Sequence, residues 1–117
     1  MRRSPRGFLW DVVDAADAIT QFTQDRTLAD FTTDLMLRSA VERQFEIIGE
    51  ALSQLAKIDP AVAARIPELR RVVNFRNALI HGYDRVEALV VWQAISERLP
   101  PLRARAAALF AALQDPA

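Results

Sequence analysis

The segment from Arg76 to Tyr83 gathers side chains that could do chemistry: a guanidinium, an amide, an imidazole and a phenol. Arg76 follows Leu69 by seven residues and precedes Ile80 by four, so a helix here would place a permanent charge inside its own apolar stripe. A buried guanidinium without a partner is costly. Arg76 must therefore pair with a carboxylate, extend to solvent or face a cleft that binds an anion.

His81 is expected at the C-terminal end of the same helix, where the helix dipole favours a protonated imidazole. A histidine can accept or donate a proton near neutral pH, and an arginine can bind a phosphate group through two hydrogen bonds. Asn77 stands one turn before His81, so it could orient the imidazole or hold a phosphate oxygen. This chemistry suits metal-independent cleavage of RNA, whose own 2′-hydroxyl is the nucleophile.

The residues alone leave a structural interpretation open, in which Arg76 is satisfied within the fold and His81 only caps its helix. Tyr83 follows a turn at Gly82, which is the residue best able to end a helix in the left-handed conformation. Its hydroxyl would then project towards the same cleft as the imidazole of His81.

Three acidic residues lie one helical turn apart before the motif: Glu42, Glu46 and Glu50. Such a row is usually a solvated helix face. Alternatively, one of the three pairs with Arg76, with His81 or with an arginine of a partner protein. Gly49 stands inside the same helical pattern, where glycine costs about 1 kcal/mol relative to alanine, and this favours a close approach of another helix over contact with substrate.

The 117 residues carry no net charge, so no global field steers this chain towards nucleic acid. The charge is uneven, because five arginines and only two acids lie between Arg65 and Arg85. The absence of cysteine excludes disulfides and thiolate chemistry, and a single histidine argues against a metal cage, so we expect no metal and no cofactor. Asp11, Asp14 and Asp17 interrupt any signal-peptide core, and we expect a cytoplasmic protein without a membrane span.

The composition is helical, because Ala, Leu, Arg, Gln and Glu are abundant whereas only three glycines occur. Apolar spacing predicts substantial helices over residues 8–24, 33–57, 69–82 and 84–98, and a last one that follows Pro100-Pro101 and fades by residue 114. The longest carries an apolar seam typical of a central bundle helix. Its members are Leu37, Val41, Phe45, Ile48, Leu52 and Leu55.

Two short helical turns are expected between these segments. Thr27 and Asp30 form a capping-box pattern that predicts one turn through Phe31. Asp59-Pro60 is typical of an N-cap followed by proline at the first helical position, and predicts a second turn that Pro67 closes. Both tryptophans are expected in the core or at an interface: Trp10 and Trp92.

The ordered set Arg76-Asn77, His81 and Tyr83 resembles the Arg-x4-6-His motif of the HEPN superfamily of helical ribonucleases. The closer resemblance is to the HepT-like toxins of MntA/HepT (type VII) toxin-antitoxin systems, and it runs from about residue 8 to 113. Further matching features, in chain order, are Ala40-Val41-Glu42-Arg43, Ile47-Ile48-Gly49-Glu50-Ala51, Ile66-Pro67, Val91-Trp92 and Leu99-Pro100-Pro101-Leu102.

The resemblance implies one all-α domain over residues 1–117, with 1–6 and 115–117 as flexible ends. The implied fold is an antiparallel four-to-five-helix bundle that pairs as a two-fold homodimer, its two motifs facing one another across a shared cleft. Because one histidine per chain cannot easily serve as both acid and base, a dimer would supply two copies of each group.

The function implied is that of an RNA-cleaving toxin, with RNA as substrate and no DNA partner. Arg76 would stabilise the phosphate, His81 would be the acid or base, and Asn77 would assist. An MntA-like nucleotidyltransferase antitoxin would neutralise the toxin by adenylylating Tyr83. Supporting candidates are Arg43, Glu46 and Glu50. The alternative is a catalytically inactive HEPN module that binds a nucleotide or docks the nucleotidyltransferase.

Overall fold

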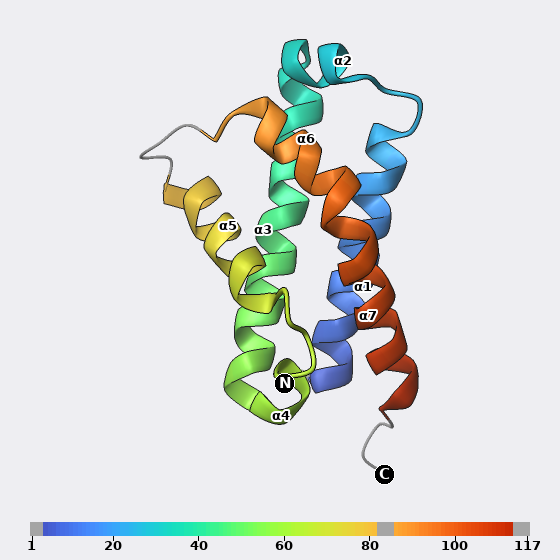
Figure 1. Ribbon diagram of the computed structural model, residues 1–117, viewed down its shortest axis with the longest axis vertical. Helices are drawn as coiled ribbons and strands as arrows, with labels where there is room; N and C mark the ends of the chain where they lie inside the picture. The colour runs from blue at the N-terminus through green and yellow to red at the C-terminus, as the bar shows by residue number, and fades with distance from the viewer. Residues whose placement is uncertain (1–3, 82–85, 114–117) are drawn as a thin grey trace.

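The computed structural model describes residues 4–81 and 86–113, and all regular structure in these ranges is helical. Figure 1 shows a bundle in which α3 (Leu35–Ile58) runs through the middle, between α1 (Pro5–Thr23) on one side and α5 (Leu69–His81) on the other. Helix α7 (Leu99–Ala112) packs along α1, while α6 (Ala88–Glu97) packs against α7 and against the short α2 (Leu28–Thr33). The expectation of an all-α bundle is confirmed.

The N-terminal helix begins earlier than its apolar spacing indicated. The Ser4 side chain accepts a hydrogen bond from the backbone N–H of Gly7, and Pro5 occupies the first turn, where a missing N–H costs nothing. Pro5 and Arg6, which lie within the predicted flexible end, are thus part of α1. Arg6 also ties α1 to α7, because its Nε donates to the carbonyl of Phe110 over 3.1 Å and its guanidinium lies over that ring.

The predicted caps of the two short helices are confirmed. Thr27 and Asp30 form the reciprocal capping box at the start of α2, which continues two residues beyond the expected end at Phe31. Asp59 accepts from the backbone N–H of Val62 and so caps α4 (Pro60–Ala63). Asp34, which we had not singled out, caps the long helix by accepting from the N–H of Leu37.

The boundary between the last two helices differs from the prediction. The chain breaks at Arg98, and Pro100 and Pro101 lie inside the first turn of α7 rather than in a separating segment. The reason is that backbone N–H groups of a first helical turn have no intrahelical acceptor, so proline is tolerated there. Glu87 precedes α6 but forms no side-chain capping bond, and Asp84 lies outside the described residues.

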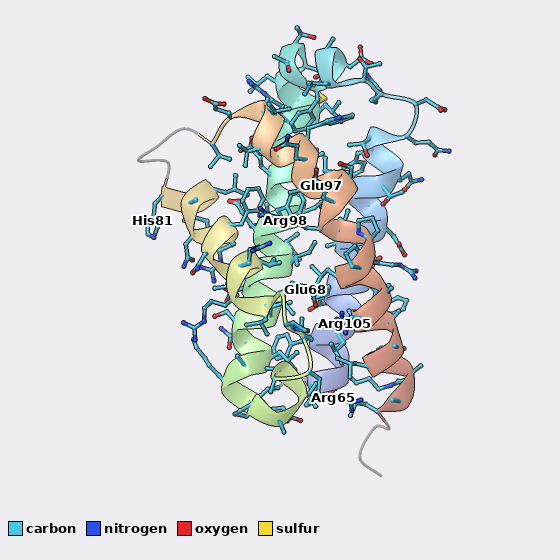
Figure 2. All side chains as sticks on the ribbon, viewed as in Figure 1. Arg65, Glu68, His81, Glu97, Arg98 and Arg105 are labelled. Atoms are coloured by element: carbon cyan, nitrogen blue, oxygen red, sulfur yellow. The ribbon has the colours of Figure 1, made fainter. Side chains whose placement is uncertain are left out.

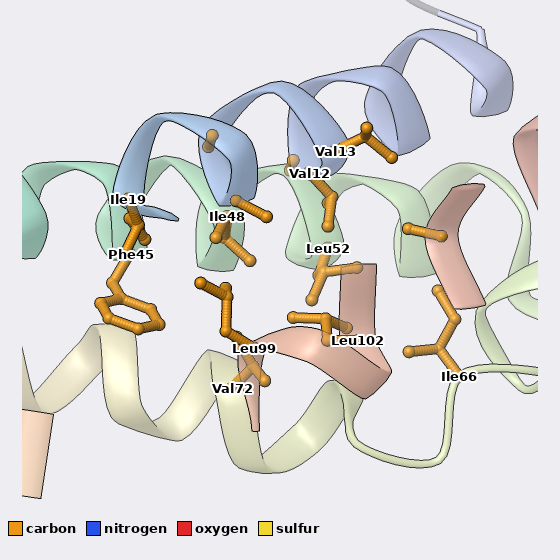
Figure 3. Packing of buried hydrophobic residues seen from close by; sticks show 14 of the residues in the cluster. Val12, Val13, Ile19, Phe45, Ile48, Leu52, Ile66, Val72, Leu99 and Leu102 are labelled. Carbon is orange, nitrogen blue, oxygen red and sulfur yellow. The ribbon is translucent and has the colours of Figure 1, made fainter. Parts of the chain in front are cut away.

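The core forms where α1, α3 and α7 meet, as the close-up in Figure 3 shows. The predicted seam of α3 is confirmed throughout, because every one of its six apolar members is buried. Trp92 packs against the buried Phe31 with ring centroids 5.3 Å apart, whereas Trp10 pairs with Phe110 at the surface and is 51% exposed.

Helix α5 packs differently from its predicted stripe. Val72 is its only buried residue, Leu69 and Val73 are partly covered, and Ile80 is 52% exposed. The apolar pattern overstated burial because α5 lies at the edge of the bundle and packs chiefly on α3. This position leaves much of the motif-bearing helix open to solvent.

Candidate functional site

The candidate site is built where the C-terminal half of α5 crosses the middle of α3. These helices run in opposite directions (Figure 1), so Arg76 of α5 comes level with Gly49 and Glu50 of α3. Phe75 fixes this level from the neighbouring position, since its ring meets that of Phe45 edge to face with centroids 5.2 Å apart. Apolar packing on α3 therefore sets the height at which the polar residues of α5 meet their partners.

Gly49 makes the close approach of Arg76 possible. A Cβ atom built on Gly49 would lie 2.7 Å from Cγ of Arg76 and closer still to its Cβ, which is tighter than van der Waals contact allows. The aliphatic stem of Arg76 thus occupies the space that any other residue at position 49 would fill. The expectation that Gly49 permits close helix approach is confirmed, and the residue that approaches is the motif arginine.

The guanidinium of Arg76 is held on two sides. One terminal nitrogen donates to a carboxylate oxygen of Glu50, and the other donates to Oδ1 of Asn77 over 2.7 Å. Its Nε is buried and has no hydrogen-bond partner in the structure. The side chain is 18% exposed, so the charge sits in the α3–α5 junction and still reaches solvent.

Two held nitrogens leave the guanidinium with further N–H groups, because arginine carries five donors. The fixed orientation and the remaining donors are what binding a phosphate oxygen requires. Of the outcomes open to Arg76, the structure shows pairing with a carboxylate and partial access to solvent. Glu50 is thus the member of the acidic row that pairs with the motif.

Glu50 is itself oriented by a residue that the motif does not include. Gln54 lies one turn later on α3 and donates from Nε2 to the second carboxylate oxygen of Glu50 over 3.1 Å. The i, i+4 spacing of the two residues was the available signal. With 57% of its side chain exposed, Glu50 needs such a neighbour to hold one rotamer.

The other supporting candidates lie beside this pair. Glu46 and Arg43 share a small cavity of about 160 Å³ with Glu50, between α3 and α1. Among the described residues, neither Glu46 nor Arg43 forms a hydrogen bond or ion pair with Arg76. Glu50 and Asn77 contact the guanidinium, and a supporting role for Glu46 and Arg43 stays a prediction.

Glu42 faces a separate groove, of about 320 Å³, between the N-terminal half of α3, the end of α5 and the start of α6. Burial raises the pKa of the Glu42 carboxyl; nearby Arg38 opposes the rise and Glu46 adds to it. The acidic row thus divides, because Glu50 pairs with the motif arginine whereas Glu42 is partly desolvated elsewhere.

His81 is the last residue of α5 and is exposed, one turn after Asn77. Figure 2 shows its imidazole projecting outward from the end of the helix. The side-chain oxygen of Asn77 accepts a hydrogen bond from Arg76. Gly82 and Tyr83 lie outside the described residues, so the expected turn and the position of the phenol are not described.

Comparison with known proteins places this arrangement in a family. Residues 12–109, from α1 to the last turns of α7, match the family model for "Ribonuclease HepT-like" proteins. The match includes the whole of α5 and its partner helix α3. The chain belongs to the HepT-like ribonuclease family.

Several HepT-like relatives are similar over nearly their whole length. The chain is 33% identical over 105 residues to a "Probable ribonuclease HepT" of Thermococcus cleftensis, covering 90% of this chain and 94% of the relative. It is 30% identical over 102 residues to "Putative RNase MJ1380" of Methanocaldococcus jannaschii, covering 87% and 93%. A third relative, "Putative RNase TTE0752" of Caldanaerobacter subterraneus, is 28% identical over 100 residues, covering 86% and 88%. No solved structure matches the chain.

Two further observations bear on sequence-based expectations for this HepT-like chain. Within residues 4–81 and 86–113, no three or more histidine, cysteine, aspartate or glutamate side chains are grouped so that they could hold a metal ion. In the same ranges, no helix has both the length and the apolar character that crossing a bilayer requires.

Proposed function

We propose that this chain is a metal-independent endoribonuclease whose site is formed by Arg76, Asn77 and His81. The observation that carries the proposal is the guanidinium of Arg76, anchored by Glu50 and Asn77 and followed five residues later by the exposed imidazole at the end of α5. Membership of the HepT-like ribonuclease family supports RNA as the substrate.

The proposed reaction uses the 2′-hydroxyl of the RNA as nucleophile. A base takes the proton from this hydroxyl, and the oxygen attacks the adjacent phosphorus. The bond from phosphorus to the 5′-oxygen breaks, and the leaving oxygen takes up a proton from an acid. His81 is the group suited to proton transfer, and Arg76 offsets the negative charge that builds on the phosphoryl oxygens.

A two-fold dimer would complete this chemistry. The chain has one histidine, and the reaction needs a proton acceptor and a proton donor. An isologous dimer with the two α5 ends facing one another would place two imidazoles and two guanidinium groups around one phosphate. The exposure of His81 and Ile80 at the end of α5 is compatible with such a face.

We place the activity in a toxin-antitoxin pair in the cytoplasm. The antitoxin would be a nucleotidyltransferase that transfers AMP from ATP to the hydroxyl of Tyr83 and releases pyrophosphate. The added phosphate carries negative charge close in sequence to Arg76 and His81, where the substrate phosphate would otherwise bind. Adenylylation would therefore block the binding of RNA without altering the fold.

Cleavage in the presence of EDTA tests the proposed activity. Purified protein should cut single-stranded RNA with chelator present, and His81→Ala should lower the rate by at least about a hundredfold. Ser96→Ala, at an exposed position of α6 outside the proposed site, is the control and should cut like the wild type. Equal cleavage by the His81 variant, or no cleavage by the wild type at any dose, would favour the alternative of an inactive binding module.

The antitoxin proposal needs a separate experiment. Co-expression with a nucleotidyltransferase encoded next to this chain should restore growth and add the mass of AMP to the peptide that contains Tyr83. Tyr83→Phe removes the acceptor hydroxyl, so this variant should stay toxic in the presence of the partner. Rescue of the Tyr83→Phe variant without a mass change would contradict modification at this residue.

A further inference from the structure

A third hollow lies between α3 and α5, at the end of their contact opposite the Glu42 groove. It has a volume of about 380 Å³ and is bounded by the C-terminal half of α3 and the N-terminal half of α5. Lys57 and Arg70 stand at it from opposite helices, with the polar side chains of Ser53 and Asn74. Leu69 and Val73 give it an apolar wall. The hollow thus combines two cations, two hydrogen-bonding groups and a patch for an apolar surface.

The two cations form no ion pair among the described residues of the chain. Lys57 and Arg70 are both exposed, and neither forms an ion pair with a described carboxylate. The first turn of α5, to which Arg70 belongs, contains no acidic residue. This contrasts with Arg105, whose Nε meets Glu68 at 2.8 Å. Positive charge at the hollow is therefore available to an anionic ligand.

Residues of the hollow and of the proposed catalytic site follow one another along one face of α5. Arg70, Asn74, Asn77 and His81 follow one another at spacings of four, three and four, which keeps them on the same side of a helix. On α3 the matching face carries Lys57 and Ser53 and then, one turn earlier, Glu50. At a rise of about 1.5 Å per residue, the row on α5 extends about 16 Å, which is longer than one nucleotide.

We propose that this hollow is a binding subsite for the RNA strand next to the scissile phosphate. Lys57 and Arg70 would each contact a backbone phosphate, and Leu69 and Val73 would pack against a sugar or base. Ser53 and Asn74 would offer hydrogen bonds to the same stretch of RNA. The chain has no net charge, so its attraction for RNA must come from local groups of cations. The two cations at the hollow are complementary to the phosphates of a polyanion. The inference rests on the proposed ribonuclease function and extends it.

Binding of a single-stranded RNA that carries 2′-O-methyl groups throughout tests the subsite without cleavage, because its 2′-oxygen has no proton to lose. The Lys57→Gln, Arg70→Gln double variant should bind about tenfold more weakly, and the slope of log affinity against log salt should fall by about 0.7 for each cation removed. Arg71→Gln is the matched control for the single variant Arg70→Gln. It removes the same charge from the next residue on α5, which is also exposed and does not line the hollow.

Cleavage of unmodified RNA supplies a second readout. The double variant should raise KM by a similar factor and keep kcat at saturating RNA, because the lost contacts are made equally in the ground state and the transition state. If Arg70→Gln and Arg71→Gln weaken binding equally, the affinity depends on total charge and not on position, and the subsite is overturned. Unchanged affinity in the double variant would overturn it as well.

The two proposals fail in different ways. Wild-type protein that binds the methylated RNA through Lys57 and Arg70 but never cuts unmodified RNA would support the subsite and reject the nuclease. RNA cleavage with the same KM in the wild type and in the double variant would support the nuclease and reject the subsite. Circular dichroism of each variant checks that these exposed substitutions leave the bundle folded.

Discussion

The guanidinium of Arg76 on α5 is anchored to the carboxylate of Glu50 on α3, beside the close approach of the two helices at Gly49. The ion pair is half in solvent on the glutamate side and mostly covered on the arginine side. Its consequence is geometric, because a side chain with many rotamers is held in one orientation beside the end of α5. Arg76 can then present its remaining N–H groups to a substrate without first being ordered.

Removing this anchor should affect activity and stability together. Glu50→Ala leaves the largely covered Arg76 without its carboxylate, and we expect unfolding to become easier by about 1–3 kcal/mol. RNA cleavage should fall by about tenfold through kcat, since the arginine loses its fixed orientation. Urea unfolding and single-turnover cleavage measure the two effects. Glu97→Gln, at an exposed position on α6, is the control, and an equal effect there would contradict a specific role for Glu50.

Substitution of Gly49 should displace Arg76 without touching any polar group. Gly49→Ala improves helix propensity by about 1 kcal/mol, but its methyl group would meet the first carbons of the Arg76 side chain. The nearer of these carbons, Cβ, is fixed by the α5 backbone and cannot rotate away, so the helix must shift. We expect a net loss of stability of about 1–2 kcal/mol, measured by urea unfolding, and reduced cleavage.

A second alanine variant separates the crowding caused by the added methyl group from the gain in helix propensity. Ser53→Ala adds helix propensity one turn later on α3 and replaces a side chain by a smaller one, so it should leave the fold at least as stable. A stabilised Gly49→Ala protein with full cleavage activity would contradict the close contact with Arg76.

Arg76→Lys should retain charge and lose function. A lysine ammonium is a single point of charge, so it cannot hold Glu50 and Asn77 on two sides and still present a planar edge to phosphate. We expect cleavage to fall by about a hundredfold while the melting temperature changes little compared with Arg76→Ala. Activity close to wild type in the lysine variant would show that only the charge matters.

The Glu42 carboxyl predicts a pH dependence of stability. Burial raises its pKa above the ordinary value of 4.5, so the folded protein holds a proton that the unfolded chain releases. Between the ordinary pKa and the raised one, stability therefore falls as pH increases. Glu42→Gln removes this loss, and should raise the melting temperature at pH 7.5.

The same variant should show no such gain at pH 4, because below the ordinary pKa both states of the wild type are protonated. Melting curves of the wild type and of Glu42→Gln at the two pH values measure the difference. A gain of equal size at both pH values would mean that the charge of Glu42 is not its cause.

Much of this protein was determined locally by its sequence. The seam of α3 and the caps at Thr27 and Asp59 could be predicted, because helical period and capping depend on residues within one or two turns of each other. The spacing of Arg76, Asn77 and His81 on one helix was likewise visible. The position of α5 at the edge of the bundle was not, because an apolar stripe reports which face is buried and not how deeply.

Only the tertiary structure decided which acid meets Arg76. Glu42, Glu46 and Glu50 have equivalent spacing, and nothing local distinguishes them. The choice follows from how far α5 slides along α3, which the Phe45–Phe75 contact and the missing side chain at Gly49 set together. The hollow between Lys57 and Arg70 depends on the same register. Sequence thus supplied the groups that could do chemistry, and packing between distant segments determined which of them stand together.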